Sequence, residues 1–119
     1  MEIKNSTKEG HIIVEIAGSL DSNTVSDAET KIMPLIVEKS CMVLDMTKCS
    51  YVSSAGLRLL LMVTKQLASK GGWLTLTGVC TEVKDVMEMT GFSCFFKAYK
   101  DIPEALAALK KEKDKNAKN

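Results

Sequence analysis

The sequence has little of what metal sites, disulfide frameworks and nucleotide-binding loops require. Only one histidine, His11, occurs among the 119 residues, and no pair of the four cysteines has CxxC spacing. Because a zinc site needs clustered ligands at characteristic spacing, we expect no metal. The patterns GxxxxGK[ST] and GxGxxG are both missing, so no nucleotide cofactor is expected either. The cysteines, which we expect to be reduced, buried or inert thiols, are Cys41, Cys49, Cys80 and Cys94.

Charge of one sign is also missing, because 16 basic residues are balanced by 15 acidic ones and the net charge is +1. This balance gives no broad basic surface for nucleic acid or for an anionic membrane. The first ten residues lack the basic-then-apolar pattern of a signal peptide, and the densest apolar stretch, 57–63, is too short to span a bilayer. We therefore expect a cytoplasmic protein with one domain over residues 1–109 and a charged, disordered tail over residues 110–119.

Short runs of apolar and β-branched residues predict the strands of a sheet. They lie at 11–17, 41–46, 73–77 and 95–99, and residues 1–5 can pair with the first run through a turn at 6–10. The run at 41–46 is apolar apart from Asp45, which is typical of a strand buried on both faces.

Apolar residues at helical spacing predict a helix after each of these four runs. The third helix is expected to bury Val83, Val86 and Met87. Strands alternating with helices indicate an α/β domain with a mixed, mostly parallel β-sheet of about five strands and about four helices. The residues expected at helix ends are Asp21, Ser22 or Asn23 as the cap of the first helix, Pro34 near its end, Gly71 and Gly72 after the second, and Thr81 as the cap of the third.

The segment 51–61, YVSSAGLRLLL, places two serines and a glycine where the most hydrophobic helix begins. Ser53 or Ser54 is well placed as an N-cap, and Gly56 lets another backbone or a ligand approach closely. A nucleophilic serine would need a base within reach, but the GxSxG pattern is missing and a lone histidine in a strand is more often structural. We therefore expect no catalytic residue. A helix N-terminus favours anions, so a phosphate added here would be tolerated.

Five segments in this order resemble a STAS domain of the anti-sigma factor antagonist family: HIIVEIAGSLDSNT, VLDMTKCSYV, SSAGLRLLL, GGWLTLTGV and VKDVMEMTGF. The resemblance implies a mixed sheet with helices packed on it, and a switch cycle. The unmodified antagonist binds an anti-sigma factor, often a serine kinase, and so frees a sigma factor for transcription. The kinase phosphorylates a serine at the start of the second helix, and a serine phosphatase reverses this.

The family pattern at that position is Asp-Ser-Ser/Thr/Ala-Gly-Leu. Aligned on Gly56, the resemblance puts the phosphoacceptor on Ser54, with Ser53 as the alternative. Ser53 stands where the family has an acidic residue. An alternative function is that of a non-phosphorylated STAS accessory subunit of another complex, such as a lipid-transport system. The partner-binding residues that the resemblance implies are Asp21, Ser22, Asn23, Thr24, Asp45, Ser53, Ser54, Ala55, Gly56 and Arg58.

Overall fold

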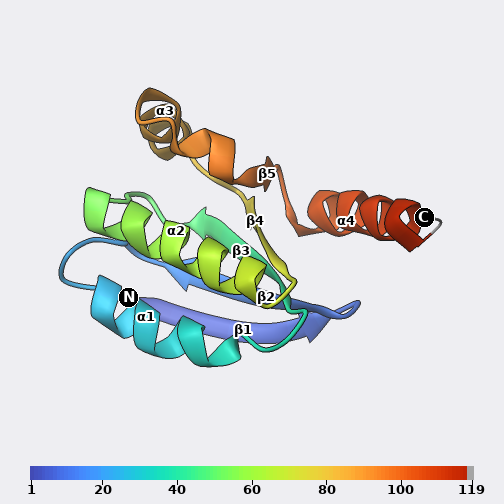
Figure 1. The fold of residues 1–119 in the computed structure, drawn as a ribbon. Coiled ribbons are helices and arrows are strands. Elements are labelled where there is room, and N and C mark those ends of the chain that lie inside the picture. Colours follow the sequence, from blue (N-terminus) through green and yellow to red (C-terminus); the bar gives the residue numbers. More distant parts are fainter. Residues whose placement is uncertain (118–119) are drawn as a thin grey trace.

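A computed structural model describes the backbone of residues 1–117 and the side chains of residues 1–94 and 96–110. The described residues form one five-stranded sheet in the order β1-β2-β3-β4-β5 (Figure 1). The first two strands pair antiparallel and the other neighbours pair parallel, which confirms the expected mixed sheet. The strands are β1 (Glu2–Lys8), β2 (His11–Ala17), β3 (Cys41–Lys48), β4 (Trp73–Thr77) and β5 (Lys97–Tyr99).

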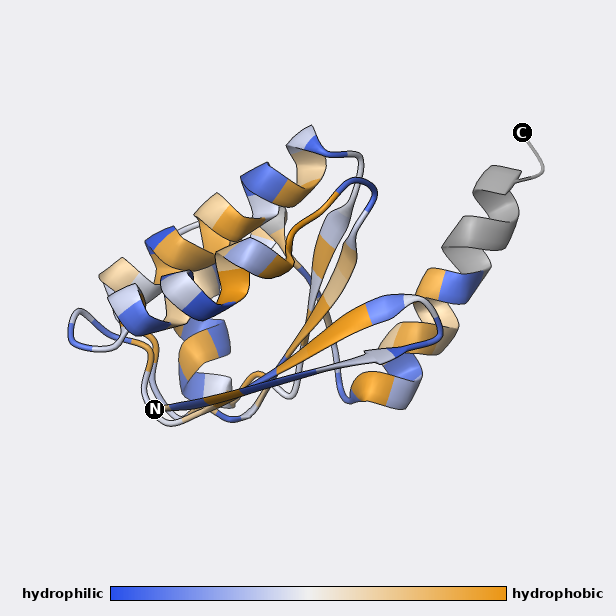
Figure 2. Cartoon of the chain, turned by 90° about the horizontal axis from the view of Figure 1, so that it is seen from below, coloured by the Kyte–Doolittle hydropathy of each residue, from blue (hydrophilic) through white to orange (hydrophobic). Residues whose placement is uncertain are grey.

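Helices cover both faces of this sheet. One face carries the larger core, in which Leu44 of β3 and Leu60 of α2 are fully buried, and the other carries a smaller core with Val43 and Leu109 of α4. Figure 2 shows how hydrophobic and hydrophilic residues alternate along the helices that pack on the sheet. The expected α/β class is confirmed. The helices are α1 (Val25–Ile32), α2 (Ser54–Ser69), α3 (Thr81–Met89) and α4 (Ile102–Ala117), with short 3-10 turns η1 (Met33–Leu35) and η2 (Phe92–Phe95).

The strand boundaries differ from the expected ones at both edges of the sheet. Residues 6–8 belong to β1 and pair with β2, so the expected turn at 6–10 is too long. The turn is made by Glu9 and Gly10, whose positive φ values of 51° and 80° suit a two-residue hairpin loop. At the other edge β5 is only Lys97–Tyr99, because the chain before it forms η2.

Two of the expected helix caps are wrong. Thr24 is the N-cap of α1, and the Oδ1 of Asp21 accepts a hydrogen bond from Asn23 N at 2.9 Å instead of capping the helix. The N-cap of α3 is Cys80, while Thr81 is the first helical residue. Asp and Thr side chains can bond to the backbone inside a tight turn, and those of Asp21 and Thr24 do so in the loop before α1.

The expected helix ends are confirmed. Pro34 lies in the 3-10 turn that follows α1, since its missing N–H and its ring cannot continue an α-helix. At the end of α2, Gly71 has a φ of 81°, and Gly72 N donates to the carbonyl of Leu67 at 2.8 Å.

The expectation for residues 110–119 stays a prediction. Helix α4 ends at Ala117, but the side chains beyond Lys110 and residues 118–119 lie outside the described part. None of the helices in the described part is long and apolar enough to cross a membrane.

Candidate functional site

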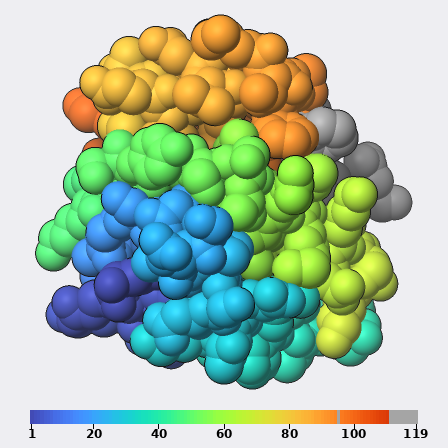
Figure 3. All heavy atoms as spheres, turned by 90° about the vertical axis from the view of Figure 1, so that its left-hand side faces the viewer, coloured from blue at the N-terminus to red at the C-terminus, as the bar shows by residue number. Residues whose placement is uncertain are grey.

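Two loops at the carboxyl ends of β2 and β3 run side by side and position the start of α2. Leu20 N donates to the carbonyl of Tyr51 at 2.9 Å, and Ser53 N donates to the carbonyl of Leu20 at 2.9 Å. Leu20 and Val52 also form an isolated parallel bridge. The α2-start surface is thus held together by backbone bonds, and Figure 3 shows these loops in contact, with α3 above them. We define this surface as Asp21, Ser22, Asn23, Thr24, Ser53, Ser54, Ala55 and Arg58.

The two serines of this surface have different environments. Ser53 is the N-cap of α2, and its half-buried Oγ accepts a hydrogen bond from Gly56 N at 3.3 Å. Ser54 is the first helical residue, its side chain is exposed, and no residue of the described part hydrogen-bonds its hydroxyl. The expected N-cap is therefore Ser53, which leaves the Ser54 hydroxyl accessible.

Gly56 has the role of a close-packed contact. A Cβ at this position would lie 2.6 Å from the Leu20 carbonyl oxygen and 2.8 Å from Val52 Cγ1. Another backbone does approach Gly56 closely, as expected, and it belongs to the loop around Leu20 in the same chain. Because Gly56 is buried, it supports the α2-start surface from beneath and is not itself part of it.

The loop before α1 is held by a local hydrogen-bond network. Asp21 N donates to Thr24 Oγ1 at 2.9 Å, and Thr24 Oγ1 donates to the carbonyl of Ser19 at 2.8 Å. These bonds leave the side chains of Ser22 and Asn23 exposed and that of Asp21 half-buried. The loop presents a defined polar edge beside Ser54.

Arg58 lies one helical turn after Ser54 on the exposed side of α2. Residues four apart on a helix are neighbours, so the guanidinium can reach a group attached to Ser54. The ion pairs found among the described side chains join Lys4 to Glu2 and Lys31 to Asp27, and neither involves Arg58.

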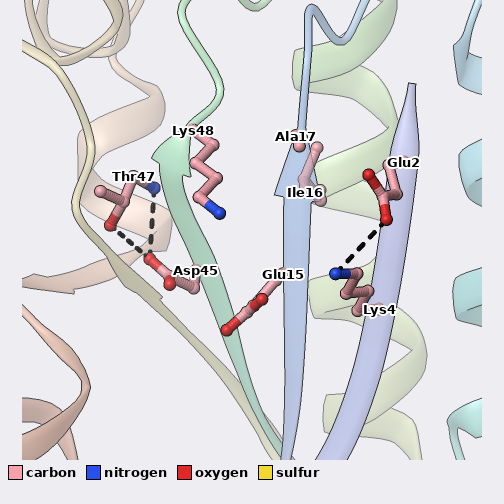
Figure 4. A pocket seen from close by; sticks show the side chains of 8 residues that line it. All are labelled: Glu2, Lys4, Glu15, Ile16, Ala17, Asp45, Thr47 and Lys48. Atoms are coloured by element: carbon pink, nitrogen blue, oxygen red, sulfur yellow. Dashed lines mark hydrogen bonds and ion pairs between the residues drawn. The ribbon is translucent and has the colours of Figure 1, made fainter.

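Asp45 does not join this surface. It lies on the sheet face opposite α2, where its Oδ1 accepts from Thr47 Oγ1 at 2.6 Å and from Thr77 Oγ1 at 3.2 Å. It lines a hollow of about 150 Å³ in that face together with Glu15 and Lys48 (Figure 4). Its hydrogen bonds stabilise the ends of β3 and β4.

His11 and Ser54 lie at opposite ends of the sheet. His11 begins β2, is buried, and its Nδ1 lies 3.0 Å from the carbonyl oxygen of Glu9. The α2-start surface follows the other end of β2, roughly 20 Å away at about 3.3 Å per residue. A Ser–His catalytic pair is thus not formed.

The cysteines differ in exposure. Cys49 is buried, its Sγ lies 3.5 Å from the Tyr51 carbonyl, and burial raises the pKa of its thiol. Cys94 is exposed, so burial does not hold at this position, and the expectation that the thiols are inert stays a prediction. In the described part, no group of three or more His, Cys, Asp or Glu side chains could hold a metal ion.

Exposed apolar residues occur in the loop before α2 and on α3, and the sequence did not predict their exposure. Tyr51 is 55% exposed, and on α3 Val86 is 40% and Met89 86% exposed. Cys80 Sγ lies 3.8 Å from the Ser50 carbonyl, which places the start of α3 beside this surface. Val86 was expected in the core, but only Val83 and Met87, four residues apart, are buried.

Comparisons with known proteins agree with this architecture. A family model described as STAS domain matches residues 2–105. The BtrV protein of Bordetella bronchiseptica, described as a candidate anti-sigma factor antagonist, is 31% identical over 111 residues, covering 92% of this chain and 96% of BtrV.

Two solved structures have the same fold. An anti-sigma factor antagonist from Mycobacterium paratuberculosis superposes with a TM-score of 0.82 at 20% identity, covering 92% of this chain and 93% of that one. The Bacillus cell fate determinant SpoIIAA in its phosphorylated form has a TM-score of 0.68 at 18% identity, covering 91% and 99%.

Proposed function

The chain belongs to the STAS domain family, and on this premise we propose that it is an anti-sigma factor antagonist switched by phosphorylation of Ser54. The unphosphorylated α2-start surface binds an anti-sigma factor that is also a serine kinase, which frees a sigma factor for transcription. Phosphorylation by that kinase weakens the complex, and a serine phosphatase restores binding. The relatives support the proposal, because BtrV and the mycobacterial protein have antagonist names and SpoIIAA is known in a phosphorylated form.

The observation that carries the choice of residue is the difference between Ser53 and Ser54. A kinase needs an accessible hydroxyl, and Ser54 is exposed while the Oγ of Ser53 is occupied by Gly56 N. Ser53 already serves as the helix cap, a role that contributes about 1 kcal/mol. The resemblance expects an acid at position 53, and Ser and Asp are both favoured N-caps, so the substitution retains the capping role.

The physical basis of the switch is electrostatic. A phosphate adds about −1.5 to −2 charges at neutral pH, and the N-terminus of α2 stabilises it without refolding. Asp21 follows Leu20, which is bonded to Ser53, so the phosphate and this carboxylate would form one anionic region. A partner surface shaped for a neutral hydroxyl loses affinity by desolvation and repulsion. A loss of about 3 kcal/mol is roughly a hundredfold in Kd.

The test uses a purified kinase-type anti-sigma factor that binds the wild-type chain, with ATP and intact-mass analysis. We expect the mass increase of one phosphate on the wild type and on Ser53→Ala, and none on Ser54→Ala. If Ser53→Ala alone abolishes the increase, the assignment of Ser54 is wrong. Circular dichroism of both variants checks that they fold.

Binding of the same anti-sigma factor to Ser54→Asp tests the switch separately. We expect Ser54→Asp to bind much more weakly than Ser54→Ala. Equal binding by the two variants would contradict the switch and would favour the non-phosphorylated accessory function, in which this surface only docks a partner.

A further inference from the structure

The exposed side of α2 carries only positive charge. The helix contains Arg58 and Lys65 and no aspartate or glutamate along its 16 residues. Both cations are exposed, and neither takes part in an ion pair with a described residue. In a chain whose net charge is +1, this concentrates unneutralised positive charge on one helix.

Apolar side chains lie between the two cations. Leu61 and Met62 are half-buried, and with Arg58, Lys65 and Gln66 they line a hollow of about 280 Å³ on α2. Residues 58, 61, 62 and 65 are spaced i, i+3, i+4 and i+7, so they share one side of the helix. The two charges are therefore about 10 Å apart along the axis, at about 1.5 Å per residue. We call these four residues the α2 stripe.

The α2 stripe continues the α2-start surface. Ser54 is four residues before Arg58, so it heads the same side of the helix. In Figure 3 the residues of α2 form a band between the loop before α1 and α3, open to the outside along its length. A partner that covers Ser54 would also lie over the stripe.

We propose that the α2 stripe binds an acidic amphipathic helix of the anti-sigma factor. This inference rests on the proposed function. Apolar side chains of this helix contact Leu61 and Met62, and two carboxylates about two turns apart pair with Arg58 and Lys65.

Charge favours an acidic helix over two other occupants, a second copy of the chain and nucleic acid. A second copy of the chain in a two-fold contact would place these cations against the same cations. Nucleic acid is held by many phosphate contacts, and two cations on a nearly neutral chain supply few.

The stripe also explains how one modification can disrupt a larger interface. A phosphate on Ser54 would pair with Arg58 within the same helix and so occupy a cation that the partner uses. Its remaining negative charge would then face the partner's carboxylates at the head of the stripe. Competition and repulsion act together, although the modified atom touches only one end of the interface.

The experiment measures Kd for the purified kinase-type anti-sigma factor by titration calorimetry at two salt concentrations. We expect Lys65→Glu to weaken binding about tenfold and to reduce the salt dependence, and Lys65→Gln to weaken it about threefold. Lys8→Glu, which makes the same charge change on the exposed β1–β2 hairpin, is the control and should bind as the wild type does. Carbodiimide coupling of the complex should link Lys65 to a partner Asp or Glu, and Lys65→Arg should remove that link.

The outcomes separate this inference from the proposed function. If Ser54→Asp abolishes binding while Lys65→Glu binds as tightly as the wild type, the stripe is not part of the interface and the proposed function stands. If carbodiimide treatment of the complex links Lys65 to no partner carboxylate, the proposed role of the α2 stripe is likewise overturned. If the unmodified chain binds no kinase-type anti-sigma factor, both proposals are overturned.

Discussion

Replacing Gly56 with alanine tests how the α2-start surface is built. The new methyl group would lie 2.6 Å from the Leu20 carbonyl oxygen and 2.8 Å from Val52 Cγ1, whereas ordinary contacts begin near 3.4 Å. Both neighbours belong to the bridge between the two loops, so they must move apart by more than half an ångström. The movement strains the bond from Ser53 N to the Leu20 carbonyl.

Two effects of opposite sign decide the result. Overpacking a close contact costs about 1–3 kcal/mol, while alanine has a helix propensity about 1 kcal/mol better than glycine. Because the first contact is a backbone oxygen held in a bridge, we expect packing to dominate. With the packing cost in the upper part of its range, about 2–3 kcal/mol, the expected net loss is about 1–2 kcal/mol, which for a domain of this size lowers Tm by roughly 4–8 °C.

Urea and thermal unfolding, followed by circular dichroism, measure this change. Ala68→Gly, at an exposed position on the same helix, is the matched control that isolates helix propensity and should cost up to about 1 kcal/mol. A Gly56→Ala variant that is as stable as the wild type, or more stable, would refute the reasoning. It would mean that the loops relax at no cost and that the contact is not tight in solution.

Two further predictions concern Asp45 and Cys49. Asp45→Asn should lower the free energy of unfolding by about 1–2 kcal/mol, because Thr47 and Thr77 donate to the Asp45 carboxylate. Partner binding should be unchanged, because Asp45 lies on the sheet face opposite α2. Weaker binding at unchanged stability would contradict this prediction. Burial raises the pKa of Cys49 above its ordinary value of 9.0, so the folded chain retains this proton at a pH where the unfolded chain has lost it. Stability should therefore fall as the pH rises above about 9, and urea titrations at pH 8 and 10 should show a smaller fall for Cys49→Ala.

The order of strands and helices could be predicted because each element carries its own period. The run at 41–46 is buried on both faces in the structure, as continuous apolarity indicated, and the four helices follow their strands. The sequence predicted that Ser53 or Ser54 caps α2, but it could not decide between these two serines. The choice depends on where the helix begins, and this is set by the bonds between Leu20 and its neighbours, which come from distant parts of the chain.

The position of Asp45 could have been predicted from the strand period. Side chains alternate along a strand, so Asp45 shares a face with Val43 and not with Leu44 or Met46, which pack beneath the helices. The grouping of Asp45 with Ser54 came from the family resemblance, which does not take this alternation into account. Thr75 and Thr77 show the limit of the same rule, because both are fully buried although alternation alone would place threonine toward solvent. This face of β4 is in contact with α4, and the packing of α4 on the strand is not specified by any pattern within the strand.

The hydrogen bonds around Thr24 have a kinetic consequence. Thr24 Oγ1 accepts from Asp21 N and donates to the Ser19 carbonyl, so the loop beside Ser54 has little freedom to lose when a partner docks. Encounter can then proceed as rigid-body docking, with association rate constants near the usual 10⁵–10⁷ M⁻¹s⁻¹. In the proposed switch, phosphorylation of Ser54 would therefore act chiefly on the dissociation rate of the complex. A kinase that is already bound would then shorten the residence time at once, without waiting for the surface to refold.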